Sequence, residues 1–337
     1  MEDFIKGIPK CELHMHICGN TEPELVFKIA ERNHVKIQYE SAEQLRKAYH
    51  FSCLQEFLDI LKLCSSVVKK PQDLYDITYD YLEKAHSDNV KYCELYFTPQ
   101  SFKPDMTFDE ATEAVVNACK NGEKELGIKS RLILCQQRYQ PESSTIEVLH
   151  ELLKCPFKDY YVAVGLANAE LPYPPKLFVN MFQEAKASGF KITIHAGEEG
   201  PSDYIKQAIE LCNADRIDHG NSAQDDQSVV SMLRERKIPL TMCPLSNLRL
   251  KVINDLKEHP IKKFLENGLL VTINSDDPAF FDGYLNKNFI ETQKELDLSK
   301  EHIIQLAKNS FISSFLSEEE KQKGIMEIDN YVKSFAG

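Results

Sequence analysis

Short runs of strand-forming residues alternate with longer amphipathic stretches along almost the whole chain. The stretches between them carry apolar residues at the three- and four-residue spacing of helices. Strand and helix alternating in this way predict an α/β fold in which eight parallel strands close into a (β/α)8 TIM barrel. The predicted strands are Cys11–Met15, Tyr92–Phe97, Ser130–Cys135, Tyr160–Leu166, Lys191–His195, Arg216–Asp218, Ile238–Met242 and Leu269–Asn274.

The connection between the first and second predicted strands is much longer than the others and contains two amphipathic stretches, Glu22–Arg32 and Leu54–Val67. An insertion after a barrel strand usually covers the C-terminal face of the barrel. We therefore expect a helical lid at roughly residues 20–88, with Leu54, Phe57 and Leu58 lining the substrate pocket. Plain helix packing against the barrel is the alternative.

Helices are also predicted in the other connections and beyond the last strand. Residues 1–337 should form one domain, because no linker or repeat interrupts the pattern. The predicted helices include Pro71–His86, Phe108–Leu126, Pro175–Ser188, Tyr204–Cys212, Gln227–Arg236 and Ile261–Asn267, and the extra C-terminal helices are Ser299–Ser310 and Glu318–Phe335.

Composition argues against several classes of partner. A net charge of −12 without a dense block of Lys and Arg disfavours binding to nucleic acid. The N-terminus lacks the basic and apolar regions of a signal peptide, and no apolar run approaches the ~20 residues that span a bilayer. We expect a cytoplasmic protein with no membrane partner. Its ten cysteines form no CxxC pair and mostly lie in apolar runs, so they should be reduced.

Polar residues cluster where predicted strands end, at the face of a barrel that carries the active site. His14 and His16 end the first strand, and alternate residues of a strand share a face, so both can point into the barrel mouth. His195 ends the fifth strand, and Gly197 allows a bend that projects Glu198 over the same opening. Taken singly, such histidines are also common as surface or core residues.

Two more clusters follow the sixth and eighth strands. His219 comes after the sixth, and Asp276 and Asp277 come after the eighth. Each could be an ordinary helix cap or turn, but coincidence of all the clusters with strand ends indicates an active site. Three imidazoles and one carboxylate suit a catalytic zinc ion with an open position for water. Bound zinc lowers the pKa of its water to about 7, which makes hydroxide available at neutral pH.

Five motifs in this order resemble the adenosine/adenine deaminase family of the amidohydrolase superfamily over nearly the whole chain. They are Leu13–His16, His195–Glu198, Arg216–Gly220, Cys243–Asn247 and Asn274–Pro278. Further stretches are similar to the adenine deaminase branch, which favours the free base over the nucleoside. These are Thr21–Leu25, Leu54–Asp59, His195–Pro201 and Asp277–Phe281.

The resemblance implies a zinc-dependent conversion of adenine, a small-molecule purine substrate, to hypoxanthine and ammonia. Glu198 would protonate ring nitrogen N1 while hydroxide adds to C6, and His219 would orient the hydroxide. Asp276 would also accept a proton from the water, and Asp277 would hydrogen-bond N7. An acid at N1 makes sense in itself, because addition at C6 moves electron density onto N1. One zinc ion per subunit would be held by His14, His16, His195 and Asp276.

The chain departs from the family at two positions of the presumed purine pocket. Cys18 stands where a carboxylate is usual, and Ala167, two residues after Gly165, stands where the branch commonly has Asp. We expect these three residues to contact the substrate. The smaller thiol of Cys18 should alter how the imidazole edge of the purine is recognised, or make room for a substituent. Adenosine, N6-methyladenine or another 6-substituted purine is therefore an alternative substrate, and a silent purine- or metal-binding homologue is an alternative function. Cys18 could also approach the metal, because residues 14, 16 and 18 alternate along the strand.

Overall fold

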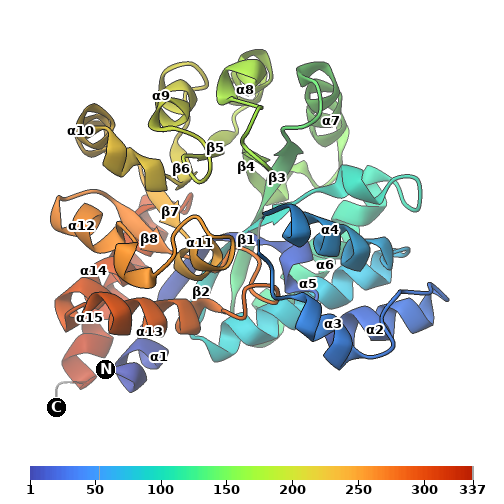
Figure 1. Ribbon diagram of the computed structural model, residues 1–337, viewed down its shortest axis with the longest axis horizontal. Helices are drawn as coiled ribbons and strands as arrows, with labels where there is room; N and C mark the ends of the chain where they lie inside the picture. The colour runs from blue at the N-terminus through green and yellow to red at the C-terminus, as the bar shows by residue number, and fades with distance from the viewer. Residues whose placement is uncertain (53, 336–337) are drawn as a thin grey trace.

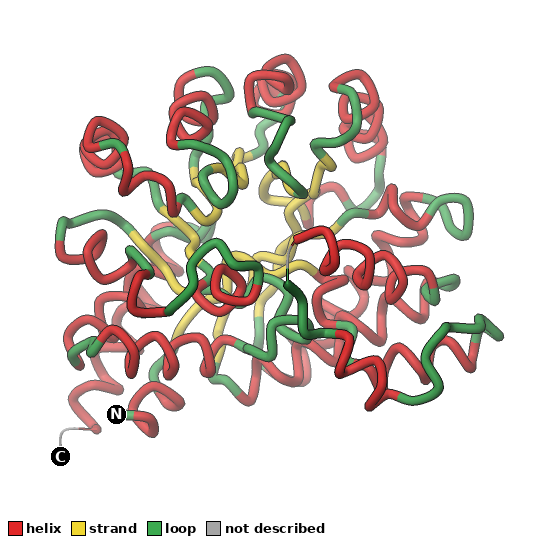
Figure 2. The backbone as a smooth tube through the Cα atoms, viewed as in Figure 1, coloured by secondary structure: helices red, strands yellow, loops and turns green. Residues whose placement is uncertain are grey.

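The computed structural model describes residues 1–52 and 54–335 of the chain. All eight strands are parallel and pair in chain order from β1 to β8, and helices surround them (Figures 1 and 2). The predicted (β/α)8 barrel is confirmed. The strands are β1 (Lys10–His16), β2 (Val90–Phe97), β3 (Lys129–Gln137), β4 (Tyr161–Ala167), β5 (Lys191–Ala196), β6 (Arg216–His219), β7 (Leu240–Met242) and β8 (Val271–Ile273).

The helices include all those predicted, with small shifts at their ends. The predicted helix at 175–188 begins with a 3₁₀ turn, Pro175–Phe178, before α8 starts. Several helices were not predicted, among them α3, α7 and α13. The helices are α1 (Glu2–Gly7), α2 (Pro23–Arg32), α3 (Ala42–Ala48), α4 (Leu54–Ser66), α5 (Pro71–Ser87), α6 (Phe108–Leu126), α7 (Glu142–Lys154), α8 (Val179–Ala187), α9 (Ser202–Glu210), α10 (Gln227–Arg236), α11 (Pro244–Arg249), α12 (Ile261–Glu266), α13 (Leu285–Leu296), α14 (Lys300–Ile312) and α15 (Glu318–Phe335).

Local sequence signals explain where such helices begin and end. Before α6, Thr107 accepts a hydrogen bond from the N–H of Glu110, whose carboxylate accepts one from the Thr107 N–H in return. The helix ends at Gly127, whose φ of 72° lies in the left-handed region that glycine adopts at little cost. Its buried residues recur at helical spacing and pack against α5 and β3.

The barrel closes between β8 and β1 through residues that follow β8. The N–H of Asp276 donates to the carbonyl of His14 at 2.9 Å, and the N–H of His16 donates to the carbonyl of Asp276 at 2.9 Å. The side chain of Asn274 accepts from the Leu13 N–H at 3.1 Å. The closing seam therefore fixes Asp276 beside the two histidines of β1 through the backbone itself.

The long β1–β2 connection divides into two parts. Helix α5 packs against α6 and β2 as an outer barrel helix, so the expected lid at 20–88 extends too far at this end. Helix α4 packs against the 3₁₀ turn Ile17–Asn20 that follows β1, whereas α2 and α3 lie at the periphery (Figure 1). Phe57 of α4 is buried, with its ring 5.5 Å from that of Phe280 and 5.0 Å from that of Phe281. Helix α4 is thus anchored on the segment after β8.

Two further expectations concern the membrane and the cysteines. Within the described part of the chain, no helix has the length and apolar character needed to cross a bilayer. The cysteines that the structure describes are all free, as expected for reduced thiols. Cys53 lies outside the described residues.

Candidate active site

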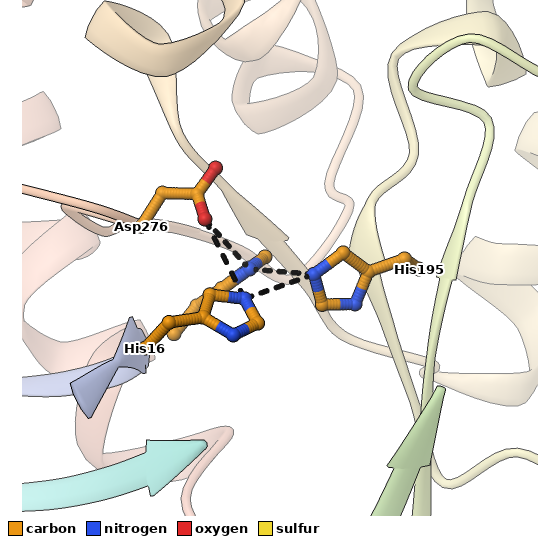
Figure 3. Close-up of side chains that lie close together, drawn as sticks. His16, His195 and Asp276 are labelled. Atoms are coloured by element: carbon orange, nitrogen blue, oxygen red, sulfur yellow. Dashed lines mark hydrogen bonds and ion pairs between the residues drawn. The ribbon is translucent and has the colours of Figure 1, made fainter. Parts of the chain in front are cut away.

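Three histidines and one aspartate converge at the C-terminal face of the barrel. Nε2 of His195 lies 3.1 Å from Nε2 of His14 and 3.2 Å from Nε2 of His16. Oδ1 of Asp276 lies 3.6 Å from the first of these β1 nitrogens and 3.5 Å from the second. Figure 3 shows His16, His195 and Asp276 pointing toward one another from β1, β5 and the segment after β8. These are the four residues predicted as metal ligands.

The spacing of these atoms fits a metal ion of the size of zinc. Tetrahedral zinc with Zn–N distances of about 2.0–2.1 Å places its nitrogen ligands roughly 3.3 Å apart, close to the separations found here. Nε2 is free to bind in His14, because Nδ1 of this ring lies 3.3 Å from the Thr241 carbonyl, to which it can donate its proton. Ligating histidines usually donate their second ring proton in this way. Three lone pairs directed at one point also call for a cation.

Burial favours the neutral form of His14 and His16, which is the form that metal ligation requires. It lowers the pKa of His14 well below its ordinary value and that of His16 to about 4, and the neighbouring His195 lowers both further. Burial alone would raise the pKa of Asp276, but the imidazoles of His219 and His16 lower it, so that this carboxylate is ionised. The site therefore combines the neutral imidazoles of His14 and His16 with the negative carboxylate of Asp276.

Asp218 is a buried carboxylate beside the cluster to which the sequence assigned no role. Its Oδ1 accepts hydrogen bonds from the hydroxyls of Thr193 at 2.8 Å and Thr241 at 2.7 Å. Its Oδ2 accepts from the hydroxyl of Tyr96 and lies 3.1 Å from Nδ1 of His195. The carboxylate is fully buried, and the surrounding His195, His14 and Arg216 lower its pKa well below the ordinary value despite the opposing effect of burial. Only its place beside His219 in a motif hinted at this position.

Backbone geometry directs two of the side chains into the site. Asp218 already faces the barrel interior, so strict alternation would turn the next residue, His219, away. His219 instead has φ of 64°, and Asp276 has φ of 63°. Residues other than glycine rarely adopt these angles, which concentrate at functional sites. These backbone angles place Nε2 of His219 3.8 Å from Oδ2 of Asp276. The same oxygen accepts a hydrogen bond from the Ser246 hydroxyl at 2.6 Å.

Glu198 lies beside this cluster, as predicted. Gly197, with φ of 81°, turns the chain after β5, and Oε2 of Glu198 comes within 3.5 Å of Nε2 of His219. Its Oε1 accepts from the amide of Asn247 at 3.5 Å. Burial and the charge of Asp276 raise the pKa of Glu198 well above its ordinary value. The raised pKa favours the protonated form of the carboxyl, which is the form that can act as an acid.

Asp277 is another buried carboxyl group, directly after the ligand Asp276. Its Oδ1 has no hydrogen-bond partner among residues 1–52 and 54–335. Burial and the adjacent charge of Asp276 raise its pKa well above the ordinary value, so it can donate a proton in a hydrogen bond. Gly19 packs directly against it, and an added Cβ there would overlap the Asp277 carboxylate.

The remaining residues predicted to line the pocket lie in different local settings. Cys18 lies in the 3₁₀ turn Ile17–Asn20 rather than on β1, and it is not part of the ligand cluster. Burial raises the pKa of its thiol to about 12, which argues against a thiolate ligand. Ala167 ends β4 in a small apolar cluster with Tyr96 and Cys135. Gly165 lies deeper in β4, where an added Cβ would meet the Tyr96 ring at 2.9 Å.

The predicted lid residues of α4 are not equally placed. Phe57 is buried against Phe280 and Phe281, whereas Leu54 and Leu58 are partly buried at the edge of the main core. Their contact with a substrate stays a prediction.

Comparison with known proteins gives one consistent result. The model of a family described as adenosine deaminase matches residues 9–331. An adenine deaminase of Acinetobacter baylyi is 44% identical over 97% of this chain and 98% of its own length. One of Hahella chejuensis is 44% identical over 99% of this chain and 100% of its own length. The crystal structure of adenine deaminase from Arthrobacter aurescens matches with a TM-score of 0.94 at 39% identity, covering 97% of this chain and 100% of that one.

Proposed function

This chain belongs to the adenosine deaminase family, and on that premise we propose that it is a zinc-dependent hydrolase converting adenine to hypoxanthine and ammonia. The convergence of three Nε2 atoms and one carboxylate oxygen beside Glu198, whose pKa is raised, carries the proposal. Relatives named adenine deaminase that match along nearly their full length support the choice of adenine. The family is metal-dependent; zinc, at one ion per chain, is our proposal for this member.

The donor set would hold zinc through His14, His16, His195 and Asp276. When bound, zinc supplies Lewis acidity that brings the pKa of a water molecule to about 7. The chain itself supplies three imidazole nitrogens, one ionised carboxylate and a buried setting that strengthens the charge interactions within it.

The other residues would orient the purine and move its protons. Glu198, held protonated by burial, would donate to N1 as water adds to C6. Asp277, also protonated, would donate a hydrogen bond to N7 from its free Oδ1. His219 faces both Glu198 and Asp276, so it can hydrogen-bond the attacking water and orient it.

Proton balance follows from these roles. Asp276 would take one proton from the attacking water for the departing amino group, which leaves C6 as ammonia. The proton given by Glu198 stays on N1 of hypoxanthine, and the second proton of the water returns to Glu198. The oxygen remains on C6, so adenine and water are consumed in equal amounts.

The test is ammonia release by the zinc-loaded protein from adenine, adenosine, N6-methyladenine and other 6-substituted purines, with Glu198→Gln as the matched blank. Turnover of adenine above the other purines is expected. These purines are compared because Cys18 and Ala167 stand where the family usually has carboxylates. A thiol and a methyl group cannot accept strong hydrogen bonds as a carboxylate does. Preference for another purine would replace adenine in the proposal, and no release from any of them would overturn it.

A further inference from the structure

Glu170, three residues beyond β4, is a buried carboxylate that the proposed mechanism does not use. It is 1% exposed. Its Oε2 accepts hydrogen bonds from the N–H groups of Gly197 at 3.0 Å and Gly200 at 3.1 Å, and its Oε1 accepts from the N–H of Glu198 at 2.8 Å. One carboxylate therefore binds three backbone donors of the turn that follows β5, including the donor of Glu198 itself.

This turn depends on Glu170 because it belongs to no helix or strand. Backbone N–H groups that are buried without an acceptor are costly, and ionised acceptors form the stronger hydrogen bonds. The turn is also shaped for this contact, since an added Cβ at Gly200 would overlap Oε2 of Glu170. The chain before Glu170 bends through Asn168, whose φ is 78°.

Arg138, just after β3, holds the other end of the same segment. It is fully buried, and its Nη2 donates to the carbonyl of His195 at 2.8 Å. Burial lowers the pKa of this guanidinium, and Glu170 is the charge that opposes that effect most. The opposite charges of Arg138 and Glu170 thus stabilise each other. Arg138 binds the backbone before Gly197, and Glu170 binds it at and after Gly197.

We propose that Glu170 is a positioning residue for the acid Glu198, acting through the backbone of residues 197–200. Glu170 fixes where the Glu198 side chain begins, and Arg138 fixes where the turn leaves β5. This inference rests on the proposed function, because it requires that Glu198 act on N1 of the substrate. Misplacement of a reacting group by about 1 Å can slow an enzyme by roughly 100-fold.

Glu170→Gln is the sharpest perturbation because it keeps the shape of the side chain. The single oxygen of glutamine can accept from the N–H groups of Gly197 and Gly200. Its NH2 group then faces the N–H of Glu198, and two donors cannot form a hydrogen bond. We expect kcat for adenine to fall about 10- to 100-fold, with KM within about twofold and zinc content equal to wild type, because the metal ligands and Asp277 are untouched. Glu147→Gln is the matched control: it removes an exposed carboxylate on α7, outside this turn, and should leave kcat within about twofold.

A double variant separates positioning from general structural damage. If Glu170 acts through Glu198, Glu170→Gln should slow the Glu198→Gln enzyme no further, because residues that act as a unit are not additive. An additional loss of about tenfold in that background would overturn the inference. So would a Glu170→Gln enzyme with wild-type kcat, or one whose KM and zinc content change as much as its kcat.

Folding and the proposed function are controlled separately. Thermal melting shows whether Glu170→Gln folds; if it does not, Glu170→Asp replaces it, since this shorter carboxylate cannot reach all three donors and should lower kcat with KM retained. Wild-type kcat in Glu170→Asp would then overturn the inference. Wild-type protein that releases no ammonia would overturn the proposed function and this inference with it, whereas an active wild type with an equally active Glu170→Gln would overturn only the inference.

Discussion

Replacement of Asp218 by asparagine should weaken zinc binding without touching a ligand. Oδ1 of Asp218 accepts hydroxyls from Thr193 and Thr241, so the single oxygen of asparagine is best placed there. The NH2 group of the asparagine then takes the place of Oδ2, which lies 3.1 Å from Nδ1 of His195 in the wild type. Two donors cannot share that contact, so His195 must move its proton to Nε2, the atom that faces His14 and His16.

The size of the effect follows from this loss of a ligand-orienting partner. Removing such a partner typically lowers metal affinity 10- to 100-fold, which corresponds to roughly 1.4–2.7 kcal/mol. Zinc affinity would be measured by competition with a chromophoric chelator, with Asp203→Asn, an exposed carboxylate on α9, as the control. An Asp218→Asn protein that binds zinc within about twofold of wild type would refute the argument that this carboxylate sets the His195 tautomer.

Three further changes test other parts of the site. Glu198→Gln should retain zinc by metal analysis yet lose about 10²- to 10⁴-fold in kcat, because it removes the acid; wild-type turnover would exclude Glu198 from that role. The raised pKa of Glu198 keeps the active, protonated form present at neutral pH, so kcat in the wild type should fall as pH rises through that pKa, and a pH–rate profile with no alkaline fall would contradict this. His14→Ala should lose most of its zinc by metal analysis, since the ring it removes faces His195 and Asp276; full occupancy would argue against the site. Gly19→Ala should raise KM for adenine about tenfold with zinc retained. The added Cβ would displace the Asp277 carboxyl, so one hydrogen bond to the purine is lost. An unchanged KM would mean that Asp277 does not hold N7.

Much of the fold could be predicted because periodicity is a local property of the chain. Short runs of strand-forming residues marked the eight strands, and these agree with the observed ones within a few residues. Helices α3 and α7 were not predicted, and α5 was assigned to the lid although it packs outside the barrel. Periodicity shows that a helix has an apolar face, but it cannot show which neighbour that face contacts.

The ends of the strands also revealed the predicted ligands. Alternation along β1 places His14 and His16 on one face, and parallel strands bring their C-terminal ends to one side of the barrel. The structure brings these two residues together with His195 and Asp276, as the sequence predicted. Cys18, by contrast, leaves the alternation because β1 gives way to a 3₁₀ turn at Ile17.

The sequence by itself determined the barrel, the face that carries the site and the residues gathered there. Tertiary structure alone decided which buried groups hold them: Asp218 beneath His195, and Glu170 behind Glu198. The physical reason is that alternation and strand ends are written within a few consecutive residues. The hydrogen bonds of a buried carboxylate instead depend on the register of distant strands and on unusual backbone angles, such as the φ of 64° at His219, which no local pattern specifies.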